Sequence, residues 1–79
     1  MSFLKLIWDF RGPDALKIAT HHEHHLVEYI TIKQLPTKQH GVTSLSDMHA
    51  IAFVVVTQEV MPQIRDDLRP HRGQLFKED

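Results

Sequence analysis

The stretch MHAIAFVVVT, residues 48–57, decides the fold of this chain. Apolar side chains occupy both of its alternating faces, and Val54, Val55 and Val56 are β-branched, which is typical of a strand covered on both sides. The pattern predicts a central strand over residues 48–57. Because both faces of such a strand need a cover, the segments before and after it are expected to supply at least one layer.

A second strand is predicted near the N-terminus, over residues 3–10. Its apolar side chains recur at every second position and form one face, made of Leu4, Leu6, Trp8 and Phe10. The opposite face carries Lys5 and Asp9. The sequence Arg-Gly-Pro-Asp at residues 11–14 combines a turn with the proline and acid that suit the first turn of a helix, so the strand ends there.

A long amphipathic helix is predicted from Asp14 to about Gln34, because no proline or glycine interrupts this segment. Its apolar side chains at helical spacing are Leu16, Ala19, Leu26 and Ile30. The helix ends at Leu35-Pro36, since the residue before a proline is displaced from the helical region.

The remaining segments predict a short strand, a second helix and an optional last strand. His40-Gly41 is a turn signal before a strand over residues 42–45, and Ser46-Asp47 favours a tight connection to the central strand. Thr57 is placed to cap a helix that Arg69-Pro70 closes, although Pro62 allows the helix to start a residue or two later. The apolar face of that helix consists of Val60, Met61, Ile64 and Leu68. Residues 73–77 form either an edge strand or a tail.

This order predicts an α+β fold with the ferredoxin-like βαββα(β) arrangement, a two-layer sandwich in which two helices cover one face of an antiparallel sheet. The 79 residues form a single domain, 1–79, since so short a chain cannot build two cores. The other face of the sheet would expose apolar side chains. We therefore expect a homodimer that joins two chains through this open face.

The composition argues against several classes of protein. Nine Lys and Arg against ten Asp and Glu give a net charge of -1, so no strong field favours nucleic acid or an anionic membrane. The absence of cysteine excludes disulfides and thiolate chemistry. The glycines are isolated, which excludes a phosphate-binding loop. The longest apolar run, residues 50–56, is far too short to span a bilayer, and we expect a cytoplasmic protein.

Seven histidines are the unusual ingredient, and four of them lie in the segment HHEHH at residues 21–25. His21 and His25 are one helical turn apart, and Glu28 continues the same face, so these three can hold a divalent metal such as zinc, nickel, copper or iron. The alternative is a hydrated surface that includes His21, His24 and His25. We favour the hydrated surface, because the spacing is a weak signal.

A second candidate site involves Glu23, His22 and His49. The helical wheel places Glu23 within the core face, where a carboxylate needs a partner such as Arg11, a histidine or a hydroxyl. If His49 faces the first helix, it can form an acid–base pair with Glu23 or His22. The alternative is a strand-end histidine that is hydrogen-bonded to the backbone.

Ligand contacts are predicted at Trp8, Asp9 and Arg11, where the first strand ends, and a second cationic patch is formed by Arg69, His71 and Arg72. Salt bridges and helix termini are the ordinary interpretation of both groups. The predicted cleft between the first helix and the sheet would be lined by Trp8, His22, Glu23 and His49.

No motif in the sequence names a reaction. We expect a small dimeric module for ligand binding, sensing or accessory functions. One alternative is an enzyme that acts on a small molecule through a His/Glu acid–base pair, and another is a histidine-rich protein that binds divalent metal. A purely structural dimer, whose surface charge changes near the imidazole pKa of about 6.5, also stays open.

Overall fold

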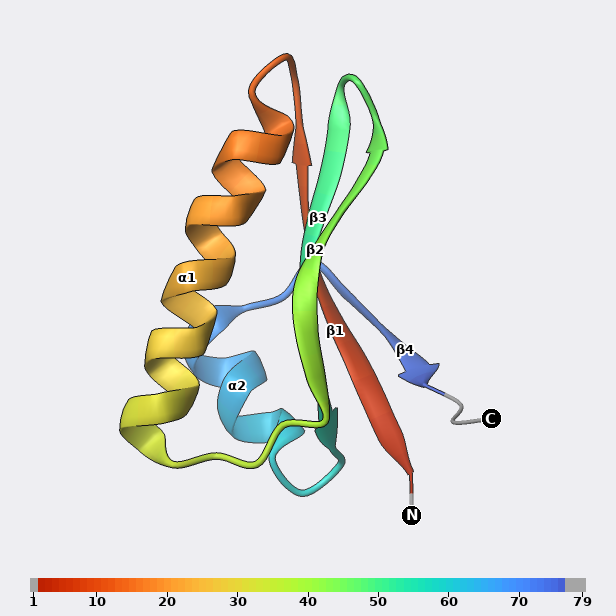
Figure 1. Ribbon diagram of the computed structural model, residues 1–79. Helices are drawn as coiled ribbons and strands as arrows, with labels where there is room; N and C mark the ends of the chain where they lie inside the picture. The colour runs from red at the N-terminus through yellow and green to blue at the C-terminus, as the bar shows by residue number, and fades with distance from the viewer. Residues whose placement is uncertain (1, 77–79) are drawn as a thin grey trace.

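The computed structural model describes residues 2–76 of the chain. Along the chain the elements are β1 (Phe3–Arg11), α1 (Ala15–Lys33), β2 (Gln39–Ser46), β3 (His49–Thr57), α2 (Met61–Leu68) and β4 (Arg72–Phe76). Figure 1 shows both helices on one side of the sheet. The α+β ferredoxin-like order predicted from the sequence is thereby confirmed. Of residues 73–77, which the sequence left open as an edge strand or a tail, 73–76 belong to the strand β4 and Lys77 lies outside the described residues.

The four strands form one antiparallel sheet in the order β2-β3-β1-β4. β3 and β1 pair along their whole length, from Thr57 opposite Phe3 to His49 opposite Arg11. The short strand β4 pairs with β1 only from Phe3 to Ile7. Within residues 2–76, therefore, no strand pairs with the outer edge of the second half of β1, and polar groups described below lie along this edge.

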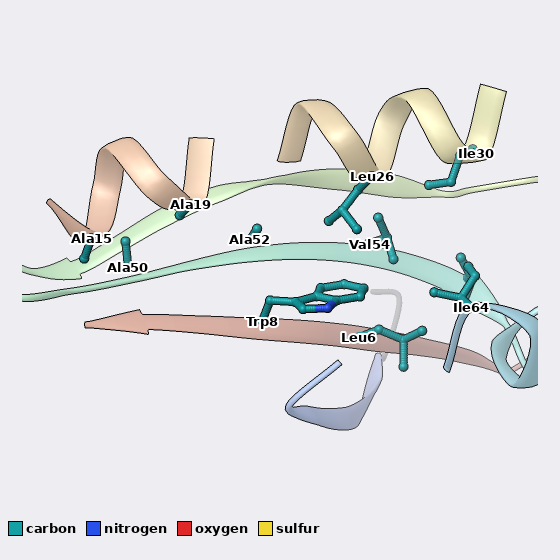
Figure 2. Packing of buried hydrophobic residues seen from close by; sticks show 11 residues of the cluster. Leu6, Trp8, Ala15, Ala19, Leu26, Ile30, Ala50, Ala52, Val54 and Ile64 are labelled. Carbon is teal, nitrogen blue, oxygen red and sulfur yellow. The ribbon is translucent and has the colours of Figure 1, made fainter. Parts of the chain in front are cut away.

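The main core lies between the sheet and the two helices (Figure 2). α1 contributes Ala15 and Ala19 near its start, opposite Ala50 and Ala52 of β3, so small side chains meet where the helix approaches the sheet. Larger side chains fill the other end, where Leu26 and Ile30 of α1 lie near Val54 and Ile64. Leu6, Trp8 and Val56 complete the cluster of buried residues. The alternation of β1 thus presents its apolar face to the helices, as predicted.

The face of the sheet without helices carries a second, smaller cluster. Ile7, Ile51, Phe53 and Val55 are only 0–8% exposed even in the single chain. Phe3 and Phe76 pack against them, and the Lys5 ammonium lies 4.3 Å from the centre of the Phe53 ring. The expected exposure of these central side chains is therefore wrong, because neighbouring side chains of the same sheet already cover them.

The strand β2 begins three residues earlier than the predicted 42–45, and the predicted turn at His40-Gly41 lies inside it. Gly41 is opposite Phe53 in the register of β2 and β3. A Cβ at this position would lie 3.2 Å from Cζ of Phe53. The glycine therefore makes room for an aromatic ring across the sheet, and its role in a turn was misassigned.

Both helices end at a residue with a left-handed backbone, Gln34 after α1 and Arg69 after α2. The predicted cap of α2 at Thr57 is wrong, because Thr57 still belongs to β3 and Val60 is the residue that precedes the helix. Pro62 lies in the first turn, where its missing N–H leaves no intrahelical bond unmade. Within residues 2–76, no helix has the length and apolarity that crossing a membrane requires.

Candidate functional site

A groove runs between α1 and the edge strand β2, with a volume of about 560 Å³. Val27, Thr31 and Ile32 of α1 form its wall, and Ile32 is 73% exposed. Three acidic or basic side chains of the same helix, Glu23, His24 and Glu28, and one of β2, His40, supply its polar groups. An apolar wall with a few convergent polar groups is the usual character of a small-molecule site.

Glu23 and His40 form a hydrogen-bonded pair in this groove. Nδ1 of His40 lies 2.7 Å from Oε2 of Glu23. The side chain of His40 is 44% exposed and that of Glu23 is 15% exposed. An ionised carboxylate only accepts, so the imidazole donates from Nδ1 and leaves Nε2 as its second polar atom. The sequence-based expectation that Glu23 needs a partner such as a histidine is confirmed, although His40 was not foreseen as that histidine.

A cluster of three charged or titratable side chains lies on the other face of the sheet, around Asp9. Arg72 donates to both oxygens of this carboxylate, from Nε at 2.9 Å and from Nη2 at 3.1 Å. Nε2 of His49 lies 2.8 Å from Oδ1 of Asp9. The hydrogen bond from Arg72 is the main reason that the pKa of Asp9 is lowered to about 2; the bond with His49 also lowers it, and desolvation opposes the shift.

The orientation of β3 overturns the proposed approach of His49 to Glu23 or His22. His49 shares its face with Ile51 and Phe53, and that face points away from the helices, whereas Glu23 and His22 belong to α1. His49 pairs instead with Asp9. This cluster resembles a saturated salt bridge more than a binding site, because both Asp9 oxygens already have cationic or imidazole partners.

His22 packs in the interface between α1 and β1. Its ring centre is 5.3 Å from that of Trp8 and 5.3 Å from that of Phe10. Its Nε2 is buried and has no hydrogen-bond partner within the described part of the chain. Desolvation by these rings is the main cause that lowers the pKa of His22, and the charges of His25, His71 and His21 lower it further.

The backbone N–H of Asp9 donates to Nδ1 of His71 at 2.8 Å. The backbone N–H of His71 in turn donates to the carbonyl of Ile7 at 2.9 Å. These two bonds continue the edge of β1 where β4 no longer pairs. His71 therefore satisfies a strand-edge donor.

His21 and His25 meet on the exposed surface of α1, with their Nε2 atoms 3.0 Å apart. Glu28, predicted as the third ligand of a metal on this face, lines the groove instead. No group of three or more His, Asp or Glu side chains within residues 2–76 is arranged to hold a metal ion. His21, His24 and His25 are all exposed, in agreement with the hydrated surface expected from the sequence.

The structure does not bring the predicted site residues into one cleft. Trp8 is 3% exposed, and its Nε1 donates to the carbonyl of Leu68, so it belongs to the core. Arg11 is exposed at the end of β1. Of the four residues predicted to line the cleft, which were Trp8, His22, Glu23 and His49, only Glu23 lines the groove beside α1. His40 is the residue that the sequence-based prediction missed, because that segment was assigned to a turn.

A scan against protein-family models, together with searches of curated proteins and of solved structures, found no match for this chain.

Proposed function

We propose that the protein is a small-molecule-binding module whose site is the groove between α1 and β2. The Glu23–His40 pair carries this proposal, because it places a carboxylate and an imidazole 2.7 Å apart inside a groove of about 560 Å³. The proposed groove takes the place of the cleft that the sequence predicted between the first helix and the sheet. Its central pair is Glu23 and His40, and Trp8, His22 and His49 of the predicted set do not line it.

The lining favours a ligand with an apolar body and a cationic head group. Glu23 and Glu28 bring two carboxylates to the groove, while Val27 and Ile32 offer apolar contact. A protonated amine would donate to Glu23 and lie against the apolar wall, whereas a carboxylate ligand would meet like charge. We therefore propose an organic amine as the ligand class.

The affinity of two small probes tests this ligand class. Phenethylamine and phenylacetate share an aromatic body and differ in the sign of their charge. The wild-type protein is expected to bind phenethylamine at least about tenfold more tightly than phenylacetate, and Glu23→Gln is expected to lose most of that preference. Asp66→Asn is the matched control, since Asp66 is a 70% exposed carboxylate on α2, away from the groove. Equal affinity for the two probes would contradict the proposal.

An enzyme is the second candidate function, and the short hydrogen bond between Glu23 and His40 favours it. A carboxylate that holds an imidazole in one tautomer is a common arrangement for general acid–base catalysis. For such an enzyme, any turnover is expected to disappear in His40→Ala and to survive in His24→Ala, which alters another histidine of the same groove.

We retain the homodimer through the helix-free face as part of the proposal, in a weaker form. The flanking Phe3 and Phe76 are partly buried and adjoin the small apolar cluster on that face. The central side chains have little surface left to bury, which reduces the expected gain from association. The groove is complete within one chain, so its proposed role does not depend on dimerisation.

A further inference from the structure

Two imidazoles converge at one point on the surface of α1, outside the groove. His21 and His25 are separated by one helical turn, and their ring centres are 4.6 Å apart with planes inclined by 68°. Their Nε2 atoms are hydrogen-bonded to each other at 3.0 Å, so one of the two rings carries its proton on Nε2. Metal binding by both Nε2 atoms therefore requires that ring to carry its proton on Nδ1 instead. Both side chains are exposed on a continuous helix that extends from Ala15 to Lys33. The helical backbone therefore keeps the two imidazole rings on the same face of α1 before any metal ion binds.

We propose that His21 and His25 form a chelating site for a divalent transition metal, with a preference for Cu²⁺ or Ni²⁺. Metal–imidazole bonds measure about 2.0–2.1 Å, so one ion bonded to both Nε2 atoms at their present separation would subtend an angle of about 94°. This angle suits two adjacent positions of a square-planar or octahedral ion. A tetrahedral ion such as Zn²⁺ would need the nitrogens to separate to about 3.3 Å.

Water would complete the coordination shell. Beside His21 the surface is hollowed, with a volume of about 500 Å³. Because His21 and His25 are both exposed, solvent water reaches the pair without any displacement of the core. The absence of a third protein ligand among residues 2–76 means that the site is a bidentate, exchangeable one, unlike a closed structural metal centre.

Metal titration of the untagged protein tests this site. Aqueous Cu²⁺, Ni²⁺ and Zn²⁺ are added in a buffer that does not chelate metals, and affinity and stoichiometry are measured by calorimetry. We expect one equivalent of Cu²⁺ or Ni²⁺ to bind, and the affinity to fall by at least about tenfold in His21→Ala and in His25→Ala. His24→Ala is the matched control, because it removes an exposed histidine of the same helix and leaves the pair intact.

Thermal unfolding supplies a second measurement. Metal that binds the folded chain raises its melting temperature, and this rise should be present in the wild type and in His24→Ala but absent in the other two variants. Alanine favours helix, so these exposed substitutions are expected to keep the fold, which circular dichroism verifies. The proposal is overturned if either single variant binds Cu²⁺ as tightly as the wild type, if His24→Ala causes the same loss, or if Zn²⁺ binds as tightly as Cu²⁺.

Discussion

The carboxylate of Asp9 holds three secondary elements together at one edge of the molecule. It is part of β1, its partner His49 begins β3, and its partner Arg72 begins β4. Because Arg72 donates to both oxygens, the ionised form of Asp9 is strongly favoured in the folded chain. Folding is thereby linked to the ionisation of a single side chain.

Acid should therefore weaken the protein through Asp9. Its folded pKa of about 2 is below the ordinary value of 3.8, so its contribution is complete above about pH 4 and is lost as the pH falls through about 2. Allowing for solvent around Arg72, which is 47% exposed, we expect a contribution of about 1–2 kcal/mol. Urea unfolding between pH 2 and pH 7 should show Asp9→Asn less stable at pH 7 by this amount and nearly equal to the wild type at the acid end.

The control for this prediction is Asp66→Asn, whose carboxylate is 70% exposed on α2. Its unfolding free energy is expected to follow that of the wild type across the whole pH range. A constant difference between Asp9→Asn and the wild type at every pH would show that Asp9 acts through packing, and the ionic account would then be wrong.

His22 carries a buried polar atom inside an apolar environment. Its buried Nε2 lacks a hydrogen-bond partner within residues 2–76, and the rings of Trp8 and Phe10 flank it. A leucine would fill this apolar environment without an unsatisfied polar atom. We expect His22→Leu to raise the free energy of unfolding by up to about 1 kcal/mol, measured by urea denaturation.

His24→Leu is the comparison for that substitution, because His24 is exposed on the same helix and should give little change in stability. A loss of more than about 1 kcal/mol in His22→Leu would contradict the prediction, since it would mean that Nε2 of His22 makes a stabilising hydrogen bond, for example to buried water.

Among the elements, β2 depends on a glycine in the middle of a strand. Alanine is normally the better strand residue, yet a Cβ at position 41 would meet Phe53 at 3.2 Å from Cζ and 3.4 Å from Cε1. We expect Gly41→Ala to lower the unfolding free energy by about 0.5–1 kcal/mol in the wild type, because the ring has to move. In a Phe53→Leu background the same change should be neutral or stabilising.

A double-mutant cycle with these two substitutions measures their coupling directly. Additive effects would contradict the assigned role of Gly41.

The same pair of residues explains why the start of β2 was not predicted from the sequence. From sequence alone, His40-Gly41 is a turn signal, and only the register that places Gly41 opposite Phe53 shows that the glycine serves a close approach between strands.

The face of His49 escaped prediction for a related reason. Both faces of β3 are apolar, so its own pattern does not reveal which face meets the helices. The orientation follows from β1, whose charged residues Lys5 and Asp9 lie on one face. Once β3 is paired with β1 so that His49 lies opposite Arg11, His49 shares that face and points away from α1.

For the whole molecule, the sequence patterns predicted the order of the first five elements and the layer arrangement, and left the last strand β4 open. These patterns are local, and each is repeated over many residues, so single errors do not change them. The candidate site depended on contacts between distant segments. Glu23 was identified as a carboxylate in need of a partner, but that partner, His40, is 17 residues away and is brought near only by the packing of β2 beside α1.

The association state also belongs to the whole molecule. Since Ile7, Ile51, Phe53 and Val55 are already 0–8% exposed in one chain, a dimer through this face would bury little additional central surface. We expect at most weak, concentration-dependent association, with a dissociation constant of micromolar order or weaker. Light scattering over a range of concentrations checks this expectation, and a dimer that persists at nanomolar concentration would contradict it.

The most direct test of the proposed function is to locate the bound amine by ¹H–¹⁵N NMR. Phenethylamine is titrated into the wild-type protein, and the backbone amide shifts are mapped onto the structure. The proposed site predicts that the largest changes occur along residues 23–32 of α1 and around His40 of β2, and that they shrink in Glu23→Gln. Changes centred on the Asp9 cluster or on the helix-free face, or unaltered changes in Glu23→Gln, would contradict the groove as the binding site.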